Sequence, residues 1–372
     1  PQQMLIRGQN LVGYKHYSKN VISSFLEKSS ENGIEIFRTF DALNDFENIE
    51  FTIKEVKRIG KHAQGTIAYT TSPVHDMSTW LDLGKKIEDS GADSLAIKDM
   101  AGLLRPFDAF DLVSNLKQSL SIPIHMQTHA TTGMSAATNM KAIEAGIDNI
   151  DTSISSLSMT YGHSATETMN AIFEGHERHI DLDMDALEES SDYFKDIREK
   201  YSEFEGDMKG VDTTMLVKQV PGGMISSLET QLKSNKQEDK IDLVKNEIPE
   251  VRKDFGYPPL VTPASQIVGA QALLNVIDGH RYKNLSNESI NLIKGNYGKL
   301  PGKIKEDLKK RVDSLDEVGE PLDPEELENM KKELKELCLE NSLPDLSENE
   351  EMLLTYILFP NIALRFFQSL NF

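Results

Sequence analysis

The first 170 residues predict an α/β fold built on a parallel sheet, and more specifically a TIM (β/α)8 barrel. Short runs of β-branched and aliphatic residues alternate with amphipathic stretches, and six such runs begin 25 to 31 residues apart. This alternation is typical of strand–helix–strand units with right-handed crossovers. No Gly-x-Gly-x-x-Gly pattern follows any of the runs, which favours a barrel over a doubly wound dinucleotide-binding sheet.

Each predicted strand is a short apolar run, and each predicted helix carries apolar residues on one face. The strands are expected at residues 4–10 without their loop end, 34–40, 65–70, 94–99, 122–129 and 147–154. Helices are expected within residues 20–33, 77–92 and 133–147, where each closes on a glycine suited to a C-cap.

Six strands are two fewer than a closed barrel of this type contains. The strand–helix rhythm does not resume after residue 175, so we expect the two remaining strands upstream of Pro1. The expected organisation is a partial barrel over residues 1–178, a helical domain over 179–325 and carboxyl-terminal helices over 326–372.

The second half of the chain predicts helices and one notable loop. Residues 219–224 read Gln-Val-Pro-Gly-Gly-Met, and we expect Gly222 and Gly223 to lie in a loop. Residues 323–341 predict a charged amphipathic helix that is solvated on one face. Residues 351–370 predict an apolar helix pair interrupted at Pro360.

The composition excludes several function classes. The formal net charge is −20 and no run of Lys or Arg stands out, which argues against binding to nucleic acid or to an anionic membrane. The single cysteine, Cys338, permits no internal disulfide and indicates a reducing compartment. No signal peptide and no apolar run of membrane-spanning length is present, so we expect a cytoplasmic protein.

Polar residues gather at the carboxyl ends of the predicted strands, where barrel enzymes place their active sites. Inward-facing barrel positions are normally apolar, so this concentration indicates a functional site. The residues concerned are Arg7, Gln9, Arg38, Asp41, Tyr69, Lys98, Asp99, Gln127, His129, Asp151 and Ser153.

Lys98 is the residue that most strongly indicates a functional site, because it directly follows the apolar run Ser-Leu-Ala-Ile. An ammonium group facing a barrel interior is costly to bury. Three interpretations are open: a structural ion pair with Asp41 or Asp99, a desolvated amine that forms a Schiff base with a keto acid, or a lysine carbamylated by CO2 that binds a metal.

Gln127 and His129 are the neighbours that a metal site would need. Side chains two residues apart on a strand project to the same side, so these two residues would share a face beside Lys98. Imidazole is a good ligand for a divalent metal, whereas the Gln127 amide is neutral and a weaker donor. A buried structural histidine remains the alternative for His129, and His125 would lie deeper in the strand.

Eight motifs occur in order along the chain: MLIRGQNLVGY, FRTFDALND, AQGTIAYTTSPVH, IKDMAG, THATTGM, DTSISSLSMTYGHSATE, QVPGGM and VTPASQIVGAQALLNV. Together they resemble the biotin-dependent carboxyltransferase family, with the oxaloacetate decarboxylase alpha subunit the most similar member and pyruvate carboxylase and transcarboxylase sharing the domain. The resemblance runs from about residue 3 to about residue 370.

The resemblance implies a TIM barrel followed by a helical domain that completes an active-site funnel. It also implies a divalent metal (Zn, Mn or Co) held by an aspartate of the first strand, a carbamylated lysine and a His-x-His pair. By motif the lysine falls on Lys98 and the second histidine on His129, while Gln127 stands where the family has the first histidine. The aspartate motif of the first strand is absent from this chain.

Four further roles follow from the resemblance. Arg7 matches the arginine that contacts the keto-acid carboxylate, and Asp41 matches an acidic residue beside the lysine and the metal. Thr262 matches the threonine that shuttles a proton between pyruvate and biotin. Gly222 and Gly223 would let the backbone approach biotin closely, although a plain turn explains them equally well.

The implied reaction moves CO2 between oxaloacetate or pyruvate and biotin. The biotin would arrive on a separate carrier domain or subunit, since its Met-Lys-Met attachment motif is absent here. The resemblance further implies a homodimer and, for a decarboxylase, a peripheral association with membrane subunits. The alternatives are the carboxyltransferase subunit of a pyruvate carboxylase, a transcarboxylase, a Schiff-base aldolase-like barrel that uses Lys98, and a catalytically impaired subunit kept for assembly.

Overall fold

The protein, analysed as a computed structural model, contains one six-stranded parallel sheet at its centre. The structure describes residues 1–13, 15–205, 210–218, 222–234, 236–315 and 323–370. The strands follow one another across the sheet in chain order, as predicted for consecutive strand–helix units. They are β1 (Gln2–Ile6), β2 (Ile34–Thr39), β3 (His62–Ala68), β4 (Ser94–Asp99), β5 (Ile124–Thr128) and β6 (Asn149–Ile150).

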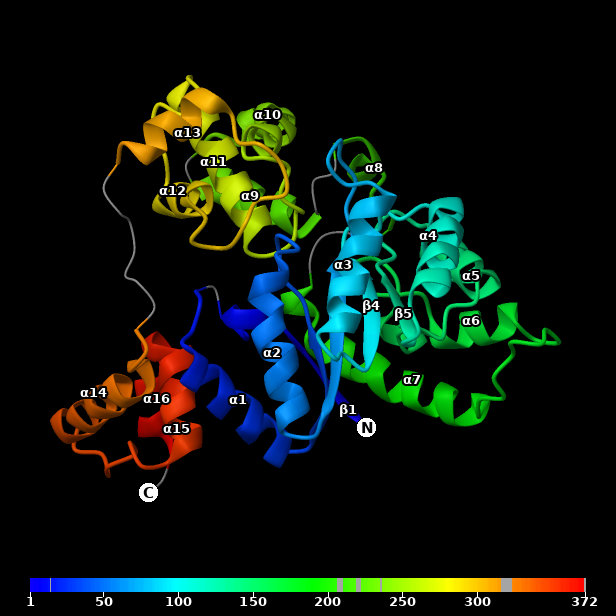
Figure 1. The fold of residues 1–372 in the computed structure, drawn as a ribbon, viewed down its shortest axis with the longest axis horizontal. Helices are drawn as coiled ribbons and strands as arrows, with labels where there is room; N and C mark the ends of the chain where they lie inside the picture. Colours follow the sequence, from blue (N-terminus) through cyan, green and yellow to red (C-terminus); the bar gives the residue numbers. More distant parts are fainter. Residues whose placement is uncertain (14, 206–209, 219–221, 235, 316–322, 371–372) are drawn as a thin grey trace.

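Helices follow the strands on the outside of the curved sheet (Figure 1). Those between strands are α1 (Lys19–Glu31), α2 (Phe46–Arg58), α3 (Met77–Asp89), α4 (Pro106–Ser119) and α5 (Ser135–Glu144). The arrangement is that of a TIM barrel of which this chain supplies six strands in the described residues, followed by a mostly helical part. Both aspects of the predicted fold class are therefore confirmed.

After β6 the described chain is helical. Its α-helices are α6 (Thr166–Ile172), α7 (Met184–Lys200), α8 (Thr214–Lys218), α9 (Gly222–Ser234), α10 (Ile241–Asp254), α11 (Ala264–Asp278), α12 (Asn287–Lys294), α13 (Glu306–Asp313), α14 (Glu326–Glu340), α15 (Glu350–Leu358) and α16 (Pro360–Ser369). Short 3-10 turns cover Gly8–Asn10, Ser155–Leu157, Ser202–Phe204 and Glu238–Lys240.

Several strand boundaries differ from the prediction, and local contacts explain those of β3 and β6. β3 begins at His62, three residues before the predicted Gly65, because His62 and Gln64 point polar groups at Ser94 and so lack the apolar signature of a strand. β6 contains only two residues, since the chain leaves the sheet soon after the amide of Asp151 donates to the carbonyl of Met126.

One loop prediction is wrong. Gly222 and Gly223 are the first two residues of α9, and residues 219–221 of the same motif lie outside the described part. Glycine weakens a helix mainly in its interior, so a glycine pair at the amino terminus does not prevent the helix. The predicted glycine ends of helices do occur: Gly33, Gly91 and Gly146 follow α1, α3 and α5 with positive φ.

Two large hydrophobic cores organise the described part of the molecule, and a small third cluster contains Phe40, Ala42 and Val261. The first lies between the sheet and its helices and also includes Leu334, Tyr356 and Phe367 of the three carboxyl-terminal helices. The second joins α9 to α13 around Val268 and Phe255. The carboxyl-terminal helices therefore pack on the sheet-bearing part, beside α1, and lie apart from the helical unit that precedes them in sequence (Figure 1).

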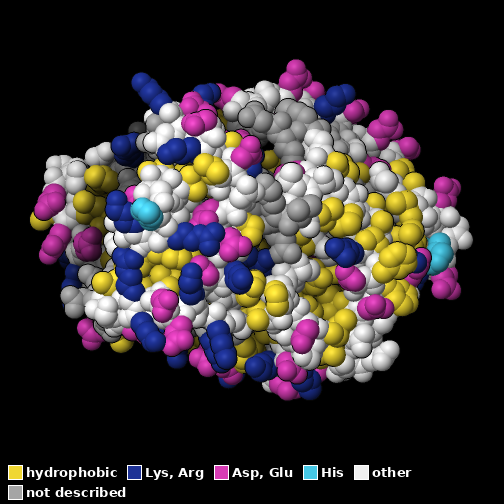
Figure 2. All heavy atoms as spheres, turned by 90° about the horizontal axis from the view of Figure 1, so that it is seen from above, with side chains coloured by type: hydrophobic (Ala, Val, Ile, Leu, Met, Phe, Trp, Pro, Cys, Tyr) yellow, Lys and Arg dark blue, Asp and Glu magenta, His cyan; other side chains and the backbone are white. Residues whose placement is uncertain are grey.

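Charged and hydrophobic side chains are unevenly distributed over the surface. Figure 2 shows Lys and Arg interspersed with Asp and Glu on one half of the face, and hydrophobic side chains gathered on the other half. That second half is the side on which Figure 1 places α4 to α7, where Phe107 and Ile180 are strongly exposed. In the described residues no helix combines the length and apolarity needed to cross a membrane.

Candidate active site

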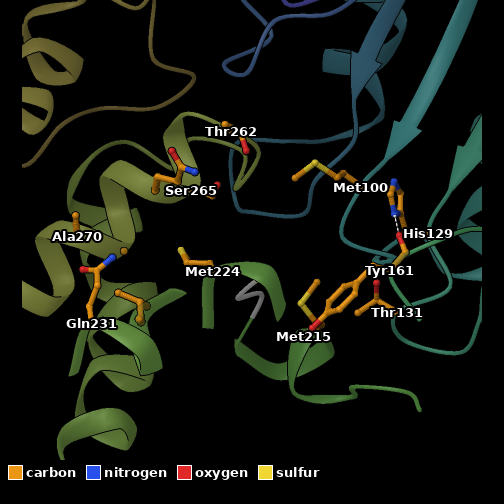
Figure 3. A pocket seen from close by; sticks show the side chains of 13 residues that line it. Met100, His129, Thr131, Tyr161, Met215, Met224, Gln231, Thr262, Ser265 and Ala270 are labelled. Atoms are coloured by element: carbon orange, nitrogen blue, oxygen red, sulfur yellow. Dashed lines mark hydrogen bonds between the residues drawn. The ribbon is translucent and has the colours of Figure 1, made fainter. Parts of the chain in front are cut away.

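A cavity of about 550 Å³ lies between the carboxyl end of the sheet and the helical unit. Residues from the two sides face one another across it in Figure 3. We call these sides the sheet wall (Met100, His129, Thr131, Tyr161) and the helical wall (Met224, Leu228, Gln231, Thr262, Ser265, Gln266, Gly269, Ala270). Met215 of α8 completes the lining.

Lys98 lies next to the sheet wall and is almost completely buried, with 4% of its surface exposed. The β4–β5 register pairs Lys98 with Gln127, and Lys98 Nζ donates to Gln127 Oε1 at 3.2 Å. Its ammonium group also lies 5.4 Å from the centre of the Phe40 ring. Burial, followed by the positive charge of Arg38, lowers the pKa of Lys98 to about 8, which increases the neutral fraction of the amine.

A short loop after β6 fixes His129. Its Nδ1 lies 2.5 Å from the carbonyl oxygen of Tyr161 (Figure 3), so this nitrogen carries the proton and Nε2 has a free lone pair. The amide of Ala130 donates to the carbonyl of Gly162, which ties the loop to β5 a second time. The ring of His163 packs against His129, with centroids 4.7 Å apart.

The environment keeps His129 neutral. Burial, and then the nearby His163 and Lys98, lower its pKa to about 4. Its Nε2 is buried and has no hydrogen-bond partner in the part of the chain that the structure describes. A buried nitrogen with an unused lone pair is costly unless a ligand uses it, so this atom is a ready donor for a metal or a substrate.

The donors in this region fit a divalent cation under one condition. His129 Nε2 supplies an imidazole and Gln127 Oε1 an amide oxygen, but an ammonium at Lys98 would repel the ion. Carbamylation would turn that cation into an oxygen ligand. Within the described residues no three His, Cys, Asp or Glu side chains form a metal cluster, so the fit depends on the modified lysine.

A buried polar network lies one layer deeper in the sheet. Arg38, 2% exposed, donates through both terminal nitrogens to Asp151, and Asp151 Oδ1 also lies 2.6 Å from His125 Nε2. Arg38 Nε donates to Gln64 Oε1 at 2.5 Å. His125 is thereby engaged by a carboxylate below the cavity and does not line it.

The Asp41 carboxylate accepts hydrogen bonds from residues that closely follow it in the chain. Its two oxygens accept from the amides of Leu43 and Asp45 and from the side chain of Asn48, at 2.8 to 3.0 Å. Burial raises its pKa to about 6 despite these bonds.

The Asp99 carboxylate is likewise occupied by hydrogen bonds within the protein. It accepts hydrogen bonds from the amides of Leu103 and Leu104 and from the Thr128 hydroxyl. In the described structure neither Asp41 nor Asp99 forms an ion pair with Lys98, so the structural ion pair that the sequence left open is absent there.

Arg7 directly follows β1 and lies within electrostatic reach of Lys98, since its charge also lowers the pKa of that lysine. Its Nη1 donates to the carbonyl of Gly13. The guanidinium is thus anchored by the loop that follows it. Arg7 does not itself line the cavity.

Thr262 is brought to the cavity by the turn before α11, where it precedes a cis-proline, Pro263. Ser265 lies in the first turn of the helix and lines the same cavity. The described residues of the helical wall include no charged side chain, so this wall presents hydroxyl, amide and apolar groups. Gly222 and Gly223 begin α9, whose Met224 lines the cavity.

The structure therefore brings Lys98, Gln127 and His129 together. It places Thr262 across the cavity from His129 (Figure 3). Sequence reasoning missed Tyr161, whose contribution is a backbone carbonyl and carries no side-chain signal. It also missed Ser265, which lies in the first turn of α11 and lines the same cavity as Thr262.

Two family models match the chain. Residues 19–193 match a model described as HMGL-like, and residues 215–371 match a model described as Conserved carboxylase domain. The chain is 47% identical to a subunit of pyruvate carboxylase from Methanocaldococcus jannaschii over 99% of its length, and covers 65% of that protein. It is 44% identical to the methylmalonyl-CoA carboxyltransferase 5S subunit of Propionibacterium freudenreichii subsp. shermanii over 98% of its length, and covers 72% of it.

Solved structures agree with this. The carboxyl transferase domain of Rhizobium etli pyruvate carboxylase, solved with pyruvate and separately with oxamate and biotin, superposes with a TM-score of 0.90 at 28% identity. The match covers 98% of this chain and 64% of that one. The sequence identities over nearly the whole chain and the shared fold lead to one conclusion: the chain belongs to the family of biotin-dependent carboxyltransferases.

Proposed function

We propose that this chain carries the carboxyl-transfer site of a biotin-dependent enzyme, with oxaloacetate and pyruvate as the carboxylated and free keto acids. The observation that carries the proposal is the cavity itself, which sets His129 of the sheet wall opposite Thr262 of the helical wall. Relatives named for pyruvate, and a neighbour solved with oxamate and biotin, support this choice of ligands.

Carboxyl transfer requires three tasks of the protein: binding the keto acid, stabilising the charge that forms on it, and moving a proton. The bond between C3 of oxaloacetate and its carboxyl group breaks, and its electron pair forms the enolate of pyruvate. The carboxyl group bonds to a ureido nitrogen of biotin, whose proton must reach C3 of the enolate. In this proposal the Thr262 hydroxyl passes that proton, giving pyruvate and carboxybiotin.

The other two tasks fall to the sheet side. Arg7 pairs with the carboxylate of the keto acid, a role suited to a guanidinium. Carbamylated Lys98, His129 and Gln127 would hold a divalent cation, whose chemistry when bound is to polarise the keto group and stabilise negative charge. His129 is already oriented for this by Tyr161. Asp41 supports the loop beside the site in this scheme.

Biotin would enter on a carrier that belongs to another segment or subunit. The described helical wall, which is uncharged, suits its neutral bicyclic ring, with Thr262 and Ser265 as hydrogen-bonding groups. Gly222 and Gly223 would lie near this entrance at the start of α9. A homodimer and docking to membrane subunits belong to the same proposal.

The test is decarboxylation of oxaloacetate by the purified chain, with and without free biotin, together with metal analysis by mass spectrometry. The proposal expects turnover that rises with biotin and a bound divalent metal that co-purifies with the protein. Turnover that does not depend on biotin, in a protein that binds metal, would contradict it.

One observation favours a second candidate. The buried, easily deprotonated amine of Lys98 also suits a Schiff base with a keto acid, as in an aldolase-like barrel. Borohydride reduction in the presence of pyruvate separates the two. A covalent adduct on Lys98 would establish the second candidate, whereas chelator sensitivity without an adduct would exclude it.

A further inference from the structure

Glu326, the first residue of α14, makes a contact that surface helices seldom make. It is 9% exposed, although it belongs to a helix whose other acidic residues are mostly solvated. Its Oε2 accepts from the backbone amide of Ser18 at 2.8 Å, and its Oε1 accepts from Lys15 Nζ at 2.8 Å. A buried carboxylate with a charge-assisted bond to a backbone amide is worth more than an exposed ion pair.

The segment that Glu326 holds is the one that carries Arg7. Arg7 Nη1 donates to the carbonyl of Gly13, and the amide of Tyr17 donates to the carbonyl of Gln9 at 2.9 Å. Tyr17 and Gly13 pack tightly, since a side chain at Gly13 would collide with the Tyr17 hydroxyl. Ser18, which Glu326 fixes, is the next residue after Tyr17.

The pKa of Tyr17 is consistent with this chain of contacts from Glu326 to Arg7. Burial, and then the negative charge of Glu326, raise the pKa of Tyr17 to about 12, while Arg7 acts on it in the opposite sense. Glu326 and Arg7 therefore both lie close enough to Tyr17 to affect its ionisation.

The same interface contains contacts that do not lead to Arg7. Ser24 of α1 donates to Glu350 at 2.6 Å, and Asn20 donates to the carbonyl of Pro324 at 3.0 Å. They dock the carboxyl-terminal helices on α1, beside which Figure 1 shows α14 to α16. The Ser24–Glu350 bond provides the matched control, because its loss weakens docking without releasing Ser18, whereas Asn20 also accepts a hydrogen bond from the Ser18 hydroxyl.

We propose that Glu326 is a positioning residue for Arg7. Its carboxylate fixes Ser18 and Lys15, the intervening loop is thereby held, and the loop carbonyl at Gly13 keeps the guanidinium aimed for a keto-acid carboxylate. The carboxyl-terminal helices thus control how well the site binds its keto acid. This inference rests on the proposed role of Arg7 in the function above.

The experiment measures KM and kcat for oxaloacetate in the full chain. Glu326→Ala is expected to raise KM about tenfold, because a hydrogen bond to a charged group is lost, and to change kcat less than about twofold. Glu326→Gln still offers an oxygen to the Ser18 amide, so its KM should return to within about threefold of the parent value. Ser24→Ala should leave both constants unchanged.

Arg7→Ala separates this inference from the proposed function. An unchanged KM in Arg7→Ala would refute the proposed role of Arg7. A raised KM in Arg7→Ala with an unchanged KM in Glu326→Ala would overturn the inference alone, as would an equal increase in Ser24→Ala. In the double variant Arg7→Ala/Glu326→Ala we expect no increase beyond that of Arg7→Ala, because both changes act on one contact; additive increases would also contradict the inference.

Discussion

The two walls of the cavity differ in kind. Charged groups lie behind the sheet wall: Lys98 and Arg38 are buried and Asp151 is partly buried. The pKa values of Lys98 and His129 are shifted strongly. The helical wall offers hydroxyl, amide and apolar groups around Thr262 and Ser265. Under the proposed function, this difference would divide the work: bond breaking would be prepared at the sheet wall, whereas the helical wall would recognise a neutral partner and move a proton.

The walls also differ in how they are held. The sheet wall is fixed by strand register and by the bonds of His129 and Ala130 to the loop 161–162. The helical unit has its own hydrophobic core and reaches the sheet through contacts such as Arg252, which donates to Thr70 at 2.9 Å. A preorganised wall and a separately packed wall would suit the proposed site, which admits a second, carrier-borne substrate.

The largest effect is expected from Lys98→Met. The variant keeps the volume of the side chain but loses the amine, so both the carbamate and a Schiff base become impossible. Turnover of oxaloacetate should fall about 1000-fold or more, the order of several kcal/mol of charge stabilisation. Lys54→Met, on the exposed face of α2, is the matched control and should be inert. Turnover above a tenth of the parent value would show that the sheet wall works without this amine.

Next in size is the effect of Asp151→Asn on stability. It leaves Arg38 buried without its carboxylate, and we expect a loss of about 3 to 5 kcal/mol in the free energy of unfolding. Urea denaturation measures it. Asp148→Asn, which breaks a half-exposed pair with Lys117, should cost less than about 1 kcal/mol for that ion pair. Equal losses in the two variants would contradict the assignment of buried charge to the sheet wall.

The ion pair between Asp151 and Arg38 also predicts that the stability of the fold depends on pH. Burial alone would raise the pKa of Asp151, but hydrogen bonds from His125 and Arg38 outweigh it and hold this pKa well below its ordinary value. A depressed folded-state pKa stabilises the fold above the unfolded-state pKa of about 4, and this stabilisation is lost as the pH falls below it. The free energy of unfolding, measured from pH 7 down to pH 3, should therefore decrease less in Asp151→Asn than in the parent.

Thr262→Ala probes the helical wall. It should lower biotin-dependent turnover about 100-fold, within the range expected for loss of a proton-transfer group, and change KM for oxaloacetate less than about threefold. Thr262→Ser retains the hydroxyl and should recover most of the rate. A serine variant as slow as the alanine variant would assign Thr262 a packing role.

The smallest expected effect tests whether Gln127 is a ligand of the proposed metal. Gln127→His replaces a neutral amide oxygen by an imidazole beside His129, and should tighten the binding of a divalent metal about tenfold. Isothermal titration of the metal-free chain measures this directly. An unchanged affinity would show that Gln127 already ligates adequately or that the ion binds elsewhere.

His129 of the sheet wall, and Lys98 and Gln127 next to it, could be predicted from sequence for a physical reason. Period-two patterning predicted one face for Gln127 and His129, and the parallel register of β4 and β5 pairs Lys98 with Gln127, one residue before the end of β5. The six parallel strands followed from the same pattern. Contacts that depend on the backbone of a distant loop, such as the carbonyl of Tyr161, leave no trace in side-chain chemistry and could not be predicted.

The helical wall was less accessible to prediction. Thr262 was identified only through a family resemblance, since a threonine before a proline has no chemical signature of its own. The glycine pair at 222–223 was assigned to a loop because local propensity favours turns, whereas the packing of α9 on α11 favours a helix. The contact between Glu326 and Ser18 spans 308 residues, a separation over which local patterns carry no information.

The most direct test of the account asks whether the two walls act on one reaction. We would measure biotin-dependent turnover of oxaloacetate in His129→Ala, in Thr262→Ala and in the double variant. If the walls act as one unit, each single variant is severely impaired and the double variant is no slower than the slower single one. If the two single losses of turnover multiply in the double variant, or if the double variant still responds fully to biotin, the claim that the two walls act on one reaction is contradicted.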